Sequence, residues 1–141
     1  MRLATLSVAG IGYLLLAGLP SGGAVAHHSF AMFETDVVLT LEGTVDEFLW
    51  TNPHSWISVV VENEQGEDEG WAIEMGGPGG LARAGWSAAT LSPGMPVSLV
   101  VRPHRDGSLF AQFMAITLPD GTQLGNPNAP LGSDAGGLPP R

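Results

Sequence analysis

The sequence predicts an all-β fold, a small five-stranded barrel with the element order of the OB-fold. Five stretches alternate apolar and polar residues with a period of two, and turns rich in glycine, proline and charged residues separate them. One short segment of helical character lies between the third and fourth stretches. Five strands with a helix in that place are typical of an OB-fold barrel. A small β-sandwich is the alternative, because element order alone does not separate the two.

The first two predicted strands, residues 37–50 and 56–62, flank a tight polar corner. In the first strand apolar residues recur at every second position, the pattern of a half-buried strand. Gly43 interrupts that row and predicts a bulge or a sharp bend. The corner at residues 51–54 contains Asn-Pro, and proline favours a turn because it fixes its own φ and has no N–H. The second strand is rich in β-branched residues, which favour strands.

Three strands and one helix complete the predicted fold. Residues 71–75 alternate as a third strand, after a charged turn. Residues 81–89 are predicted as one short helix, although Gly85 weakens it. Residues 97–101 and 110–118 then alternate as the fourth and fifth strands. An Asp-Gly pair between them indicates a hairpin.

The N-terminal residues 1–26 are predicted to be a secretory signal peptide. A single basic residue, Arg2, precedes an apolar run at residues 3–19, and a box of small residues ends at Ala26. An uncleaved membrane anchor is the competing interpretation. The run is slightly short for an anchor, and the cleavage box is well placed. We therefore expect a periplasmic or secreted protein that does not stay in the membrane after cleavage.

The mature chain is expected to hold one barrel domain, residues 27–121, followed by a tail. Residues 122–141 are rich in glycine, proline and asparagine and are predicted to be disordered. The mature chain contains four arginines, no lysine and fourteen acids, which give a formal charge near −10 with histidine neutral. Nucleic acid and anionic membranes are disfavoured as partners, because both require a basic surface. There is no cysteine, so no disulfide forms.

The four histidines, His27, His28, His54 and His104, are the most informative functional feature. None lies in an apolar strand row: two begin the predicted mature chain, and two lie in polar corners. Cleavage after Ala26 makes His27 the first residue, so that its α-amine and its imidazole can bind one metal ion. The α-amine has a pKa of roughly 8 and is partly unprotonated near neutral pH.

A second histidine would complete three nitrogen ligands around one ion, an arrangement called a histidine brace that suits Cu(II). We predict a metal site formed by His27, His28 and His54, with copper as the metal, for binding, storage or delivery. Cleavage that leaves Ala26 first would instead make His28 the third residue, as in simple copper and nickel sites of flexible peptides. Met32 offers a soft ligand for Cu(I).

The alternative is a metal-free module that binds a protein or a small ligand. The terminal histidines are then a solvated end, and the corner histidines bond backbone carbonyls. The binding surface would be the corner between Trp50 and Trp56, with the glycine-rich loop at residues 76–80. No catalytic set of residues and no other cofactor motif is recognisable, so we do not expect an enzyme. The sequence names no particular protein partner.

Several short motifs together resemble one family of small secreted bacterial proteins, classed as a domain of unknown function. The motifs are HHSF, EGTV, TNPHSW, GLARAGW and RPHRDG, and the resemblance covers residues 26–121. It implies a periplasmic or secreted β-rich domain and supplies no activity and no metal. It also implies that His104 is a weaker candidate ligand than the other three histidines, because relatives carry other residues in its place.

Overall fold

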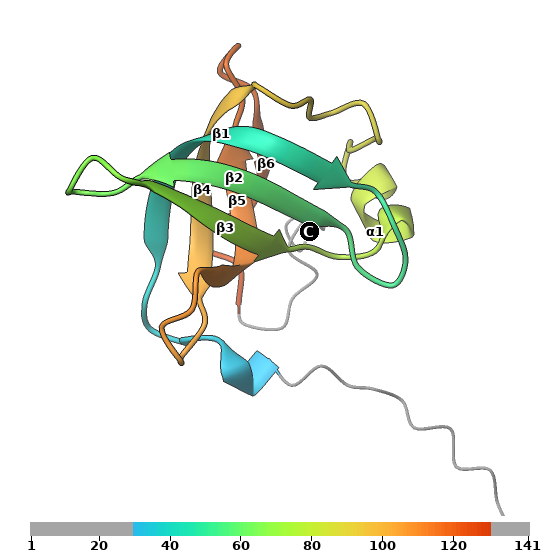
Figure 1. Ribbon diagram of the computed structural model, residues 1–141. Coiled ribbons are helices and arrows are strands. Elements are labelled where there is room, and N and C mark those ends of the chain that lie inside the picture. Colours follow the sequence, from blue (N-terminus) through green and yellow to red (C-terminus); the bar gives the residue numbers. More distant parts are fainter. Residues whose placement is uncertain (1–29, 131–141) are drawn as a thin grey trace, which may run out of the picture.

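The five predicted strands are present in a computed structural model of the chain, which describes residues 30–130. They curl into a closed barrel, with β1, β2 and β3 crossing in front of β4 and β5 in Figure 1. The elements in chain order are η1 (Phe30–Met32), β1 (Leu39–Leu49), β2 (Trp56–Glu62), β3 (Asp68–Glu74), α1 (Pro78–Arg83), β4 (Pro96–Pro103), β5 (Phe110–Thr117) and β6 (Gln123–Gly125).

The longest strand, β1, holds the two halves of the barrel together. Its first part pairs with β4 and its second part with β2, both antiparallel. The register with β2 shifts at Asp46, which is an extra residue in β1, and such a bulge bends a strand. The sequence predicted a bulge or bend at Gly43; the structure has no bulge there, because Gly43 lies in regular pairing with Val61. A Cβ at Gly43 would lie 2.6 Å from the Val60 carbonyl oxygen, so the glycine permits close strand contact.

A parallel ladder between β3 and β5 closes the ring. It pairs Ala72 with Phe110, Ile73 with Ala111, and Glu74 with Gln112. β5 also pairs antiparallel with β4, so the strands form the ring β1-β2-β3-β5-β4. The predicted five-stranded barrel with one short helix between β3 and β4 is therefore confirmed. The sandwich alternative does not apply, because the sheet closes on itself.

The core fills the inside of the barrel, as the alternation predicted. Ile57, Ile73, Leu99 and Phe113, from four different strands, have no exposed surface. In β5 the alternation changes at Met114, an extra residue in the pairing with β4, so that Phe113 and Ile116 both join the core. A period of two cannot show such a change, because a bulge moves every later side chain to the other face.

The helix begins and ends earlier than residues 81–89, the range predicted from sequence. Pro78 lies in its first turn, where a residue without an N–H is well tolerated. Gly85 has a φ of +93° and ends the helix, because its N–H bonds Ala82 and the N–H of Trp86 returns to Leu81. Leu81 and Trp86 are both buried in the core cluster. The glycine that weakens the predicted helix is thus its C-terminal stop.

Ordered structure continues beyond residue 121, where the sequence predicted a disordered tail. β6 pairs with β5 outside the ring, and Ala129 is buried. The buried Arg102 donates a hydrogen bond of 2.9 Å to the Ala129 carbonyl, which holds this segment on the barrel. This contact needs few apolar residues, so the hydrophobic alternation used to predict strands gave no sign of it. The rest of the predicted tail, residues 131–141, and the predicted signal peptide lie outside the described residues.

Candidate functional site

The polar corner between β1 and β2 is fixed to the end of β3. Ser55, which is fully buried, donates its N–H to the Gly76 carbonyl at 3.1 Å and accepts the N–H of Met75 at 2.9 Å. The bond between Asn52 and Pro53 is cis. The corner thus lies beside the strand-to-helix loop, at the end of the barrel where Figure 1 shows α1.

Within this corner, the His54 ring is oriented by two acceptors. Its Nδ1 lies 2.9 Å from Glu74 Oε1 and 3.0 Å from the Met75 carbonyl oxygen. Because both partners accept hydrogen bonds, Nδ1 carries a proton, and the neutral ring has its lone pair on Nε2. Histidines that bind metals commonly have their second ring nitrogen held by a carboxylate or a carbonyl in this way. A bond to a backbone carbonyl is also what the metal-free alternative expects of His54.

An open pocket of about 330 Å³ lies at His54. It is bounded by the corner, by the outer faces of β2, β3 and β5, and by η1. The residues that line it are Met32, Thr51, Asn52, Pro53, His54, Trp56, Glu74 and Phe110. The pocket therefore combines one imidazole, one carboxylate and one thioether with aromatic walls.

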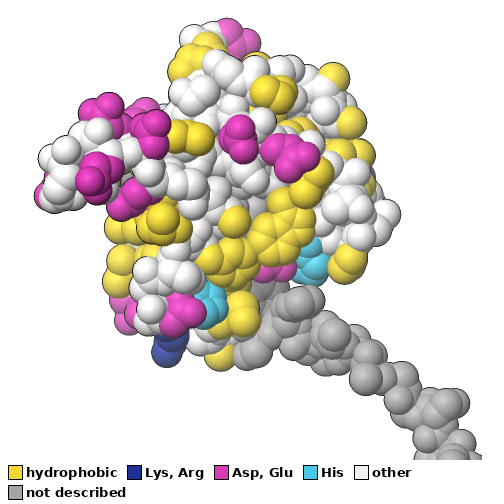
Figure 2. All heavy atoms as spheres, viewed as in Figure 1, with side chains coloured by type: hydrophobic (Ala, Val, Ile, Leu, Met, Phe, Trp, Pro, Cys, Tyr) yellow, Lys and Arg dark blue, Asp and Glu magenta, His cyan; other side chains and the backbone are white. Residues whose placement is uncertain are grey.

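The aromatic walls arise from the strand register. Ile57, Ile73 and Ala111 point into the core, so their neighbours Trp56 and Phe110 lie on the outer face of the barrel. The ring centroids of Trp56 and Phe110 are 5.5 Å apart. Figure 2 shows the resulting hydrophobic surface between two histidine side chains.

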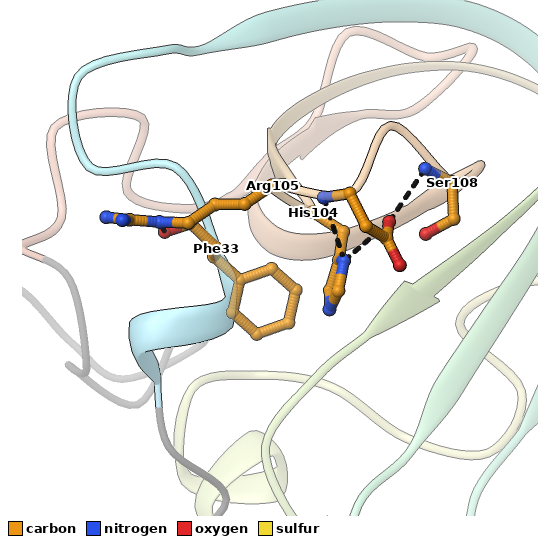
Figure 3. Close-up of polar contacts among 5 residues, drawn as sticks. Phe33, His104, Arg105 and Ser108 are labelled. Carbon is orange, nitrogen blue, oxygen red and sulfur yellow. Dashed lines mark hydrogen bonds and ion pairs between the residues drawn. The ribbon is translucent and has the colours of Figure 1, made fainter.

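The second polar corner lies beyond Phe110. The His104 ring contacts Phe110 at 5.6 Å and Phe33 at 5.8 Å between centroids, and its Nδ1 lies 2.6 Å from Asp106 Oδ1. Figure 3 shows this pair together with Arg105, whose Nε donates to the Phe33 carbonyl oxygen at 2.9 Å. The two corners thus share one face of the barrel, but His104 does not line the pocket at His54.

Hydrogen bonds lower the pKa of the Asp106 carboxyl. The hydroxyl and backbone N–H of Ser108 and the ring of His104 lower it from 3.8 to about 2. The backbone bond from Ser108 to Asp106 Oδ1 measures 2.8 Å. Asp106 is exposed and its partners belong to its own loop, so the contacts indicate a local structural role for the Asp106–His104 pair.

Only one residue of the predicted metal set, His54, lies within the described structure. His27 and His28 lie outside it. Among residues 30–130, no three His, Cys, Asp or Glu side chains group closely enough to hold a metal ion. Of the two tryptophans assigned to the corner, Trp56 lines the pocket, whereas Trp50 contacts Phe48 with centroids 5.8 Å apart.

Glu74, the acidic partner of His54, was not predicted from the sequence as a site residue. Glu74 is 8% exposed, which is unusual for a carboxylate without a reason for burial. Glu74 lies on the polar side of the alternation in β3, where residues are usually exposed to solvent. The sequence alone therefore does not distinguish a buried Glu74 from an exposed one. The available signal was its place near the end of the predicted third strand, two residues before the glycine-rich loop at residues 76–80. Phe110 and Phe33 were also missed as site residues, because alternation does not show which outward aromatics are covered.

A protein-family model matches most of the chain. It is described as a family of unknown function (DUF6152), and it matches residues 16–112, which include both histidine corners. No curated protein and no solved structure matches the chain significantly. No helix within residues 30–130 has the length and apolar character to cross a membrane.

Proposed function

Because the chain belongs to DUF6152, a family of unknown function, we propose a function from its own residues: it is a small periplasmic or secreted protein that binds copper. The ligands are the α-amine and imidazole of His27, together with His28 or His54. The role is binding, storage or delivery of the metal, without catalysis. The localisation follows from the predicted signal peptide, whose removal also creates the free α-amine.

The orientation of His54 is the observation that carries this proposal. Its Nδ1 is held by Glu74 and by the Met75 carbonyl, so the ring is fixed before any metal arrives. A ligand that is already oriented loses less conformational freedom on binding, and a carboxylate partner raises the basicity of the other ring nitrogen. The ring is 29% exposed, so the fixed imidazole remains accessible from the pocket.

Chain connectivity supports the participation of the N-terminal histidines. Met32, the last residue of η1, lines the same pocket as His54. His28 precedes Met32 by four positions, so their Cα atoms are at most about 14 Å apart, since an extended chain covers about 3.5 Å per residue. The nitrogen donors favour copper, which has the highest affinity of the first-row divalent metals for such sites.

A Cu(II) titration of the processed protein tests the proposal. The protein is exported, and its N-terminus is verified by intact mass. We expect tight one-to-one binding that one additional N-terminal residue abolishes, because the addition removes the α-amine of His27. The variants His28→Ala and His54→Ala then identify the remaining ligand, and His104→Ala is the matched control on the same face. Weak binding that does not respond to the additional residue contradicts the proposal.

One observation favours a second candidate function, a metal-free interaction module. The glycine-rich loop contacts the corner, since a Cβ at Gly77 would lie 2.8 Å from the Pro53 carbonyl oxygen. The loop thus adjoins the pocket, whose walls combine Trp56 and Phe110 with polar side chains, as in sites that bind small ligands. Binding of a partner at this surface would not depend on the N-terminal residue. The same variants therefore separate the two functions.

A further inference from the structure

We infer that the pocket at His54 is a site for Cu(I), held by the thioether of Met32 and the imidazole of His54, with the Trp56 ring beside the ion. The inference deepens the proposed copper-binding function and rests on it. It names an oxidation state and two residues, Met32 and Trp56, that the N-terminal histidine site does not require.

The placement of Met32 supports this inference. Its side chain is 36% exposed in the wall of the pocket, whereas Met75 and Met114 are buried at 2% and 1%. Its backbone is held in place, because its carbonyl oxygen accepts the N–H of Arg105 at 2.9 Å, and the next residue, Phe33, is buried. Met32 is thus an exposed thioether on a fixed backbone, and thioethers are soft ligands that select Cu(I).

The second ligand, His54, faces the same pocket as Met32. Its proton lies on Nδ1, so Nε2 is the nitrogen whose lone pair can coordinate a metal ion. Glu74 places a negative charge against the ring, with its side chain 11% exposed. That charge favours a cation in the pocket.

The aromatic wall suits a weakly hydrated monovalent ion. Trp56 lines the pocket, and Phe110 lies 5.5 Å from it between ring centroids. The face of an indole attracts cations, and the attraction increases when water is excluded. A hard divalent ion such as Mg²⁺ or Ca²⁺ prefers several oxygen ligands that include carboxylates, whereas this lining offers the carboxylate of Glu74, which is bonded to His54, and the uncharged oxygens of Thr51 and Asn52.

The test uses the full processed chain with Cu(I) under anaerobic conditions, in competition with a chromophoric chelator. Ag(I) serves as a second probe that does not change oxidation state. We expect Met32→Leu to weaken Cu(I) and Ag(I) binding by roughly tenfold or more. Loss of a residue that only orients a metal ligand already lowers metal affinity by about tenfold, so loss of a ligand should lower it at least as much. The matched control is Met95→Leu, because Met95 does not line the pocket. Quenching of tryptophan fluorescence by Ag(I) should disappear in Trp56→Phe.

The outcomes separate this inference from the proposed N-terminal site. Loss of Cu(I) binding in Met32→Leu, with Cu(II) binding unchanged, supports the pocket site. If Met32→Leu binds Cu(I) like the unsubstituted protein, or if Met95→Leu loses as much affinity, the pocket site is overturned. If Cu(I) binding depends on Met32 while Cu(II) binding ignores an additional N-terminal residue, the N-terminal site is overturned and the pocket site stands.

Discussion

Glu74 and His54 form the contact on which the candidate site depends. Glu74 comes from the end of β3, and His54 comes from the corner that is fixed beside it, so the two side chains meet through the fold and not through the sequence. A buried carboxylate at this place has a simple chemical use, because it determines which nitrogen of the imidazole carries the proton.

We expect Glu74→Gln to weaken copper binding by about 10- to 100-fold, the usual effect of changing the partner of a metal-bound histidine. The substitution keeps an oxygen that can accept the Nδ1 proton but removes the charge. Copper titration measures the change, and thermal unfolding verifies that the fold is intact. Glu67→Gln in the exposed β2–β3 turn removes the same charge and should leave affinity unchanged. Equal losses in both variants would contradict a role for Glu74 in orienting His54.

Asp106 should keep its charge to about pH 2, because Ser108 and His104 bond its ionised form. A lowered pKa means that these contacts stabilise the loop above pH 3.8 and lose their effect as the pH falls through about 2. Ser108→Ala removes the hydroxyl but not the backbone N–H, so the pKa should rise only part of the way towards 3.8. Carboxyl chemical shifts in an NMR titration measure this change. Asp120, whose pKa Thr122 lowers, serves as the internal control and should not move.

Residue-scale reasoning predicted the corner and its histidine, but not their surroundings. Asn52-Pro53-His54 is a local signal, since proline restricts the backbone wherever it occurs. The pairing of His54 with Glu74 joins positions 54 and 74, and the neighbourhood of Phe110 depends on the parallel ladder between β3 and β5. The first contact follows from the pairing of β2 with β3 and the second only from closure of the ring, and no local pattern encodes either of them.

At the scale of elements, the strands were predictable and their irregularities were not. The alternation located β1 to β5 to within a few residues, because the inside of a barrel demands an apolar residue at every second position. The extra residues Asp46 and Met114 gave no signal in composition. The sequence pointed to Gly43 as an interruption of the apolar row. The structure shows why a glycine stands there: the Val60 carbonyl oxygen leaves no room for a Cβ.

The strand contact at Gly43 leads to a test of stability. Gly43→Ala should lower the free energy of unfolding by about 1–3 kcal/mol, because the new methyl group overlaps the Val60 carbonyl oxygen and the strands must separate. Gly70→Ala is the matched control: Gly70 pairs with Val60 from the opposite strand, and a Cβ there meets no atom within 4 Å. Urea unfolding of both variants measures the difference. Equal effects would show that loss of glycine, and not the overlap, determines stability.

At the scale of the whole molecule, the segment after β6 belongs to the barrel. Ala129 is buried, and its carbonyl oxygen accepts a hydrogen bond from the buried Arg102 guanidinium. A chain that ends after Gly125 should therefore be less stable than one that ends after Pro130, by about 1–3 kcal/mol for a lost hydrogen bond to a charged group. Urea unfolding of the two truncated chains measures this. Both lack residues 131–141, so those residues do not enter the comparison, and equal stabilities would exclude a structural role for the contact.

The ladder between β3 and β5 also determines when the molecule can be completed during synthesis. The chain is synthesised from its N-terminus, so residues 72–74 are made before residues 110–112, and the ring cannot close until both segments are present. Until then β3 lacks a neighbour on one side, and β1 lacks one until β4 has been made. Strands with unpaired N–H and C=O groups readily pair with other chains. A product that stops before β5 therefore carries open sheet edges, so premature termination yields a self-associating chain instead of a smaller barrel.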